Sequence, residues 1–168
     1  GTAHAVQTAI TELPEGIENI LVIQGDDSAF YKEEALRKMI DVHLTNGNAL
    51  TFLTVELSNS TGLGRVVRDE NGNVLKIVEE KDATEIEKEI KEINPACYIF
   101  SVSFLRKYLP IVEKSPVTGE YYLVSLIELA QKNNERCEAV KGGFMAWRGV
   151  NTPEELLEAE KLYQKVNS

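Results

Sequence analysis

Apolar residues along this chain recur with two different spacings, and the two spacings predict an alternation of helices and strands. Within residues 32–46 the apolar positions return every three or four residues, which is the spacing of one helix face, and Gly47 follows as a natural helix end. The run from Ile20 to Ile23 is continuously apolar and precedes a polar turn, a pattern typical of a strand buried on both faces in a parallel sheet. A second strand is expected over residues 49–55.

Turn and capping residues predict the other elements. Two apolar segments flank Asn71-Gly72, a pair that readily adopts the dihedral angles of a tight turn, so a hairpin is expected there. Thr152 and Glu155 have the spacing of a capping box at the start of a terminal helix. The other expected helices cover residues 2–10, 84–92, 103–109 and 122–132, the terminal helix covers residues 152–166, and the other expected strands cover residues 65–67, 74–78, 96–100, 136–140 and 144–147.

Single residues add detail to three of these helices. Thr2 is a candidate N-terminal cap of the first helix, and Ser103 is a candidate cap of the helix that ends at Leu109. In the charged helix, Glu87 and Lys91 lie four residues apart and are expected to pair.

Helices and strands that alternate in this way favour a three-layer α/β domain, with the hairpin as an antiparallel insertion. With 168 residues and 43% hydrophobic content, the chain is large enough for one substantial core and too short for two ordinary domains. We therefore expect residues 1–168 to form a single domain.

The charge of the chain narrows the range of partners. Eighteen basic residues against 27 acidic residues give a net charge of -9, so the long-range field repels phosphate backbones and anionic lipid headgroups. Nucleic acid and membrane surfaces are therefore excluded as expected partners. A small anionic substrate is compatible with this charge if a bound cation or a few basic groups reverse the potential locally.

The two cysteines and the chain start indicate the compartment. Cys97 and Cys137 lie in short apolar stretches without the spacing of a metal site, so both are expected to be reduced core residues. The sequence contains no apolar run long enough to span a bilayer, and its first residues have no charged-then-apolar export signal. The expected location is the cytoplasm.

Two adjacent carboxylates follow the first expected strand. Open α/β sheets bind ligands beyond their strand ends, and Asp26 and Asp27 lie at such a position. The two residues could hold a hard cation such as Mg²⁺, or the segment could merely turn the chain and cap the next helix. Asn151 has the same ambiguity, because it precedes the cap of the last helix while its amide oxygen could complete a metal site.

Other polar or glycine-rich segments are less specific. Gly62-Leu63-Gly64 lacks the phosphate-binding pattern of dinucleotide-binding and P-loop folds, so by itself it predicts only a flexible bend. The charge run from Glu79 to Asp82 is by itself typical of a solvated face. Since the sequence offers no Ser-His-Asp arrangement and no cysteine nucleophile, the compatible chemistry is metal-assisted transfer or simple binding.

A series of short segments, taken in order, resembles one enzyme family. The segments are Gly1-Thr2-Ala3-His4-Ala5, Gly25-Asp26, Thr61-Gly62-Leu63-Gly64-Arg65, residues 77–84, Glu92-Ile93-Asn94, residues 119–123 and Gly149-Val150-Asn151-Thr152. They are similar to the uridylyltransferase domain of bifunctional N-acetylglucosamine-1-phosphate uridylyltransferases, which are sugar-1-phosphate nucleotidyltransferases. The similarity is collinear from the first residue to the last helix.

The resemblance implies a fold and a reaction. The fold would be the three-layer, Rossmann-like fold of nucleotide-diphospho-sugar transferases, with a mixed sheet and a β-hairpin insertion. The reaction would join UTP and N-acetylglucosamine-1-phosphate into UDP-N-acetylglucosamine and pyrophosphate with the help of Mg²⁺.

The resemblance also implies roles for particular residues. Nucleotide binding would fall to Gly1, Thr2, Gly25 and Asp26, Mg²⁺ coordination and hence catalysis to Asp26 and Asn151, and sugar binding to Gly64, Glu79 and Asn94.

The sequence departs from the family pattern at three places. Pro95-Ala96 stands where the family has Thr-Gly, and Asp27-Ser28 stands where the family has a small apolar residue and a proline. The family's opening strand and its Gly-x-Gly-Thr-x5-Pro-Lys loop, which would bind the triphosphate, are absent from this sequence. We therefore expect a partial domain, incomplete at the N-terminus and inactive alone, whose open sheet edge is covered by a missing segment or by self-association.

Two other functions stay open at this stage. The chain could be a noncatalytic module that binds or senses a nucleotide sugar without activating its phosphates. It could also be an interaction domain in which the resemblance reflects the fold alone, and replacing Asp26 with asparagine would then leave ligand binding unchanged.

Overall fold

The computed structural model describes residues 1–26, 28–116, 118–144, 146–150 and 152–166. Its α-helices are α1 (Thr2–Ala9), α2 (Glu33–Asn46), α3 (Glu85–Lys88), α4 (Val102–Tyr108), α5 (Ser125–Lys132) and α6 (Pro153–Val166), and its short 3₁₀ helices are η1 (Ile10–Glu12), η2 (Ser28–Phe30) and η3 (Leu109–Ile111). Its strands are β1 (Asn19–Val22), β2 (Leu50–Glu56), β3 (Arg65–Arg68), β4 (Val74–Val78), β5 (Glu92–Ile93), β6 (Tyr98–Ser101) and β7 (Cys137–Phe144).

The strands form one mixed sheet. Its order is β1-β6-β2-β5-β3-β4, and β7 pairs with the free side of β2. The pair β2 and β7 is parallel, and the other strand pairs of the described residues are antiparallel. The expected mixed sheet with a hairpin insertion is therefore confirmed, and the hairpin is formed by β3 and β4.

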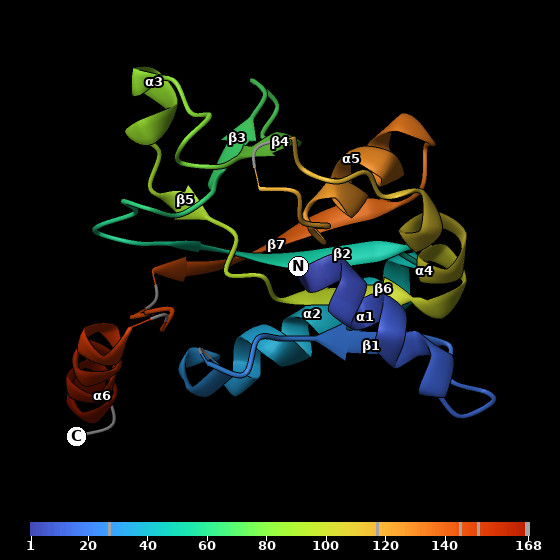
Figure 1. Cartoon of the computed structure of the whole chain (residues 1–168), viewed down its shortest axis with the longest axis horizontal. Coiled ribbons are helices and arrows are strands. Elements are labelled where there is room, and N and C mark those ends of the chain that lie inside the picture. Colours follow the sequence, from blue (N-terminus) through green and yellow to red (C-terminus); the bar gives the residue numbers. More distant parts are fainter. Residues whose placement is uncertain (27, 117, 145, 151, 167–168) are drawn as a thin grey trace.

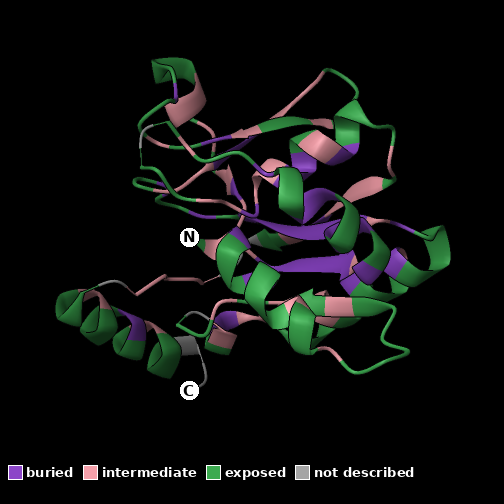
Figure 2. Ribbon diagram, turned by 45° about the vertical axis from the view of Figure 1, so that its right-hand side comes forward, coloured by how far each residue is buried: buried purple, intermediate pink, exposed green. Residues whose placement is uncertain are grey.

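Strand β2 lies at the centre and separates two hydrophobic cores. Leu50 and Phe52 belong to the core packed against α1, α4 and α5, whereas Leu53 and Val55 belong to the core packed against α2. This division follows from the two-residue period of a strand, which directs successive side chains to opposite faces. Helices consequently cover both faces of the sheet, and the expected three-layer arrangement is confirmed (Figures 1 and 2).

The prediction for the first strand was wrong in burial and in pairing. Strand β1 is the edge of the sheet among the described residues, it pairs antiparallel with β6, and Leu21 remains 42% exposed. The continuous burial expected for β1 belongs instead to β2, which has hydrogen-bonded neighbours on both sides. An apolar run predicts a strand, but its neighbours are set by segments that are distant in the sequence.

Several predicted boundaries also moved. The charged helix stops at Lys88, so Lys91 lies beyond it and Glu87 pairs with Lys76 of the hairpin at 2.8 Å instead. Helix α4 is capped by the Ser101 hydroxyl, which accepts a hydrogen bond from the Phe104 amide, and not by Ser103. Helix α5 begins at Ser125 rather than near residue 122. Strand β7 extends the expected strand 136–140 to Phe144, and residues 146 and 147, expected in a further strand, lie beyond it.

The structure contains the capping interactions that were expected at the start of α6. The Thr152 hydroxyl accepts a hydrogen bond from the Glu155 amide, and the Glu155 carboxylate accepts one from the Thr152 amide, both at 3.2 Å. This is the expected capping box. Thr2 differs from its expected role, because Gly1 occupies the N-cap position of α1 and Thr2 is the first helical residue.

Two further features concern the cysteine thiols and the lengths of the helices. Cys97 is buried and Cys137 is half-buried, and both are free thiols. Within the described ranges, each helix is too short or too polar to cross a lipid bilayer.

A buried histidine joins the sheet edge to its centre. His43 of α2 is 2% exposed, its Nε2 lies 3.0 Å from Asn19 Oδ1, and its Nδ1 lies 3.0 Å from Thr51 Oγ1. Because the Asn19 oxygen can only accept, Nε2 carries the proton and Nδ1 accepts from the Thr51 hydroxyl. This arrangement uses a neutral imidazole, and burial lowers the pKa of His43.

We expect the stability of the fold to depend on pH through His43. The unfolded chain takes up a proton near the ordinary histidine pKa of about 6.5, whereas the folded chain does so only at lower pH. The stabilisation from neutral His43 is thus complete above the pKa of the unfolded chain and is lost as the pH falls toward the folded pKa. The free energy of unfolding should change with a slope of at most about 1.4 kcal/mol per pH unit. Urea unfolding between pH 7.5 and pH 5.5 measures it.

The slope should be much smaller in His43→Gln, whose amide does not titrate in this range. His4→Gln is the matched control, because His4 is exposed on α1 and makes no buried side-chain bond among the described residues. Equal slopes in wild type and His43→Gln would show that this network does not sense pH.

Candidate active site

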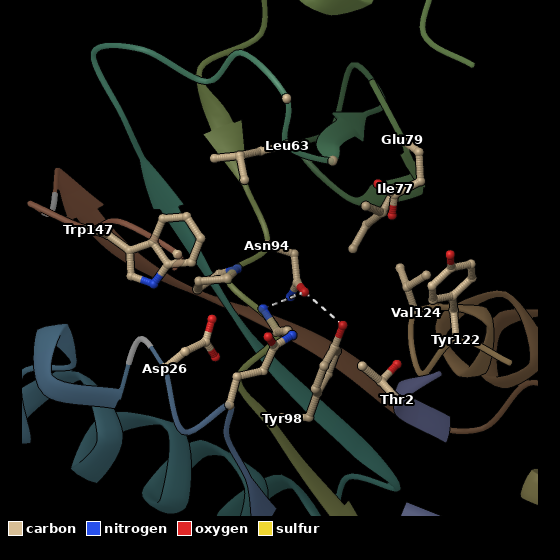
Figure 3. A pocket seen from close by; sticks show the side chains of 16 residues that line it. Thr2, Asp26, Leu63, Ile77, Glu79, Asn94, Tyr98, Tyr122, Val124 and Trp147 are labelled. Carbon is tan, nitrogen blue, oxygen red and sulfur yellow. Dashed lines mark hydrogen bonds between the residues drawn. The ribbon is translucent and has the colours of Figure 1, made fainter. Parts of the chain in front are cut away.

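A cleft of about 260 Å³ opens where the hairpin, the strand ends and the start of α1 meet (Figure 3). Its walls come from segments spread over the whole chain: Thr2, Gln24, Asp26, Gly62, Leu63, Gly64, Ile77, Glu79, Asn94, Pro95, Ala96, Tyr98, Tyr122, Val124, Trp147 and Gly149. Ligands of α/β sheets bind beyond strand ends, and Asp26 follows β1 in this way.

The cleft brings together five of the nine residues for which the sequence suggested a role. These are Thr2, Asp26, Gly64, Glu79 and Asn94. The other four are Gly1 and Gly25, which adjoin lining residues in the sequence but do not line the cleft, and Asp27 and Asn151, which lie outside the described residues.

Asn94 lies in the middle of the cleft with its amide orientation fixed by three hydrogen bonds (Figure 3). Its Nδ2 donates to the Leu53 carbonyl at 3.0 Å, and its Oδ1 accepts from the Ala96 amide at 3.0 Å and from the Tyr98 hydroxyl at 2.7 Å. If the Asn94 amide were turned over, its NH2 group would face the Ala96 N–H, which is also a donor. The Asn94 oxygen must therefore face Ala96. Within the described residues this leaves one amide hydrogen, and Asn94 can only donate to a ligand.

The turn after Asn94 has an unusual backbone. Ala96 has a φ of 55°, in the left-handed region that glycine adopts more easily than alanine. The Asn94 oxygen holds the Ala96 amide, and the Tyr31 hydroxyl donates to the Pro95 carbonyl at 2.6 Å. Bonds from two sides therefore stabilise this wall of the cleft.

Gly64 and Glu79 face each other across the hairpin wall. A Cβ atom at Gly64 would lie 3.2 Å from Ile77 Cγ2 and 3.5 Å from Glu79 Oε1, so the glycine lets these two side chains pack closely against the backbone. Partial burial, with a smaller effect from the charge of Asp82, raises the pKa of Glu79. Its carboxylate can accept hydrogen bonds from ligand hydroxyl groups.

Thr2 connects α1 to the segment before α5. Its hydroxyl oxygen accepts a hydrogen bond from the Leu123 amide at 3.0 Å, and the Ala3 amide donates to the Tyr121 carbonyl at 3.0 Å. The Thr2 hydroxyl hydrogen can therefore donate toward the cleft, where Tyr122 and Val124 form the adjoining wall (Figure 3).

Asp26 lies at the opposite end of the cleft, next to Trp147 (Figure 3). One of its carboxylate oxygens accepts a hydrogen bond from the Val150 amide at 3.3 Å. The segment with Trp147 and Val150 is tied to α6 by Arg148, which forms ion pairs with Glu155 and Glu158. The turn after β1 and the segment before α6 thus converge at this end.

The charge of the lining determines what else an anionic ligand needs. Among the described lining residues, Asp26 and Glu79 are acidic and none is basic. No three His, Cys, Asp or Glu side chains of the described residues are close enough to form an all-protein metal site. A Mg²⁺ ion that is mostly bound by phosphate oxygens and water needs only one or two carboxylates, and Asp26 fits this requirement.

Comparison with known proteins identifies the family of this chain. Over residues 1–166 the sequence matches the nucleotidyl transferase family. The chain belongs to this family. Relatives named "Bifunctional protein GlmU" come from Thermoanaerobacter pseudethanolicus, with 39% identity, and from Geobacillus sp. (strain WCH70), with 41% identity, and each match covers 98% of this chain and 36% of the relative. The chain thus spans about a third of the length of these curated relatives.

The fold of this nucleotidyl transferase chain also recurs in solved structures. The crystal structure of apo UDP-glucose pyrophosphorylase matches with a TM-score of 0.75 and 16% identity, over 100% of this chain and 61% of that chain. At this identity the likeness concerns the fold alone.

The nucleotidyl transferase cleft contains side chains that sequence reasoning did not single out, namely Gln24, Tyr98, Tyr122 and Trp147. Tyr122 lay within one of the family-like segments, which was the only signal for it. Trp147 was expected inside a strand, but it follows β7 and lies in the cleft wall.

Proposed function

We propose that this domain contributes its cleft to an enzyme for uridylyl transfer from UTP to N-acetylglucosamine-1-phosphate, which gives UDP-N-acetylglucosamine and pyrophosphate. The observation that carries this proposal is the convergence of Thr2, Asp26, Gly64, Glu79 and Asn94 on one cleft. The family-like segments that contain these residues are those of a uridylyltransferase, and the relatives support the same group. We also propose that the protein acts in the cytoplasm.

In this reaction a phosphate oxygen of the sugar phosphate forms a bond to the α-phosphorus of UTP. The bond between that phosphorus and the bridging oxygen of the β-phosphate breaks, and pyrophosphate leaves with the electron pair. The protein needs no covalent nucleophile, because alignment of the two substrates and compensation of charge supply the catalysis.

The sugar would lie between the hairpin and the turn after Asn94. Gly64 would allow the pyranose ring to approach the backbone, Glu79 would accept hydrogen bonds from its hydroxyl groups, and the free amide hydrogen of Asn94 would donate to the acetamido carbonyl. The Thr2 hydroxyl would donate to the nucleotide at the other wall.

The phosphates would lie near Asp26. Bound Mg²⁺ would supply the positive charge that this acidic cleft lacks, and Asp26 together with Asn151 would hold it. The Val150 amide would keep the Asp26 carboxylate directed into the cleft.

The single tryptophan of the chain allows a direct binding test. Because Trp147 lines the cleft and no other residue of the sequence is tryptophan, its emission should change when a ligand enters. We expect UDP-N-acetylglucosamine with Mg²⁺ to change it in a saturable manner, and dTDP-glucose and ADP-glucose to bind about tenfold or more weakly.

Trp147→Phe is the control for the assignment of the signal, since it should remove the change in emission while calorimetry still detects binding. Equal affinity for the three nucleotide sugars would overturn the uridylyl and N-acetylglucosamine preference. No saturable binding of any of them, by either method, would overturn the proposed function.

A further inference from the structure

The glycine-rich wall of the cleft is attached to a buried arginine. Gly62, Leu63 and Gly64 all line the cleft, and Arg65 follows directly as the first residue of β3. Arg65 is only 2% exposed, whereas arginine is among the residues that are rarely buried without a partner. Arg65 itself is not among the residues that line the cleft.

Glu80 joins this arginine to the wall. One oxygen, Oε2, lies 2.6 Å from Arg65 Nη2 and also accepts a hydrogen bond from the Gly62 amide at 3.0 Å. Arg65 Nη1 in turn donates to the Leu63 carbonyl. The backbone on both sides of the Gly62–Leu63 peptide is therefore bound to one ion pair.

The bonds of the ion pair to the wall affect the cleft because Glu80 directly follows Glu79. Glu79 lines the cleft, whereas Glu80 does not line it and instead accepts the hydrogen bond of the Gly62 amide, so two consecutive carboxylates after β4 have different roles at the wall. Gly62 has a φ of 82°, a conformation that glycine adopts freely and does not hold by itself. The position of the wall relative to Glu79 then depends on bonds such as those of Glu80.

We propose that the Arg65 and Glu80 ion pair is a positioning device that holds residues 62–64 at the distance from Glu79 at which the sugar of the nucleotide sugar fits. This inference rests on the proposed function, because it assigns the sugar to this part of the cleft. Neither side chain touches the ligand, and their effect is transmitted through the backbone of Gly62 and Leu63. The geometry also predicts that an uncharged acceptor at position 80 is sufficient for the positioning.

A matched control pair joins the hairpin to β5. Arg68 and Glu92 form an ion pair of 2.5 Å with side chains 16% and 13% exposed, and neither residue lines the cleft. Glu80→Ala and Glu92→Ala therefore each leave a hairpin arginine without its carboxylate. Both variants should unfold at lower temperature than wild type. Only Glu80→Ala should affect the cleft.

Calorimetry with UDP-N-acetylglucosamine and with UDP separates positioning from general loss of structure. Glu80→Ala should weaken UDP-N-acetylglucosamine binding about tenfold, the effect of about one lost hydrogen bond, and leave UDP binding within about twofold of wild type. Glu80→Gln keeps an oxygen that can accept from Gly62 and Arg65, so it should restore the affinity to within about threefold. Equal weakening of both ligands in Glu80→Ala, or weakening of the same size in Glu92→Ala, would overturn the inference.

Amide hydrogen exchange of the free protein tests the device without a ligand. The Gly62 amide should exchange faster in Glu80→Ala than in wild type, Glu80→Gln or Glu92→Ala. If wild type binds no nucleotide sugar, the proposed function fails, while faster exchange at Gly62 still supports the positioning of the wall. Unchanged exchange at Gly62 in Glu80→Ala would refute that positioning even if the proposed function holds.

Discussion

Asp26→Asn should remove most of the effect of Mg²⁺ on UTP binding. In wild type we expect Mg²⁺ to strengthen binding, because the described lining of the cleft contains two acidic side chains and no basic one. Groups that only support metal ligands contribute about 10–100-fold to metal affinity, so losing a direct carboxylate ligand should cost about 100-fold or more. Calorimetric titration of UTP with and without Mg²⁺ measures the difference.

This substitution isolates the charge of Asp26 from its structural bond. An asparagine oxygen can still accept the hydrogen bond that the Val150 amide donates at 3.3 Å, so the turn keeps its contact with the segment before α6. Asp41→Asn is the control, since Asp41 is exposed on α2 and outside the cleft. A Mg²⁺ effect of wild-type size in Asp26→Asn would refute the assignment and favour an interaction domain that only shares the fold.

The parts of the fold that depend on neighbouring residues were predictable from the sequence. The capping box of Thr152 and Glu155 and the hairpin around Asn71-Gly72 involve residues a few positions apart, and the structure contains both. The edge position of β1 was not predictable, because an apolar run indicates burial without indicating which strand lies beside it. The same limit applies to Glu87, whose partner Lys76 comes from a different element.

The candidate site was likewise only partly predictable from the sequence. Asp26 could be suggested from its place after a strand, but Glu79 and Asn94 had no signal of their own beyond the family-like segments that contain them. The bonds that orient Asn94 come from Leu53 and Tyr98, which are joined to it by the sheet. The burial of Arg65 could not be predicted from the sequence either, because arginine side chains are usually exposed.

The departure from the family pattern at Pro95-Ala96 has a structural counterpart. The family has glycine at the second position, and Ala96 adopts the left-handed conformation that favours glycine. The chain compensates for the alanine with the bonds that Asn94 makes to the turn. The stability of this cleft wall should therefore depend on Asn94 more than on any other single side chain of the turn.

Asn94→Ala should lower the free energy of unfolding by about 2–5 kcal/mol, because it leaves the Leu53 carbonyl, the Ala96 amide and the Tyr98 hydroxyl without their partner. Tyr98→Phe is the graded comparison: it removes one of these three bonds and should cost only about 0.5–1.5 kcal/mol. Urea unfolding measures both variants at a pH above the titration of His43.

The same variant tests the sugar contact. Since only one amide hydrogen of Asn94 remains for a ligand among the described residues, Asn94→Ala should weaken UDP-N-acetylglucosamine about tenfold or more and UDP-glucose much less, because glucose has no acetamido carbonyl to accept it. Equal losses for the two nucleotide sugars would mean that Asn94 acts on the turn alone. A loss of stability no larger than that of Tyr98→Phe would show instead that the turn holds its left-handed alanine without the Asn94 bonds.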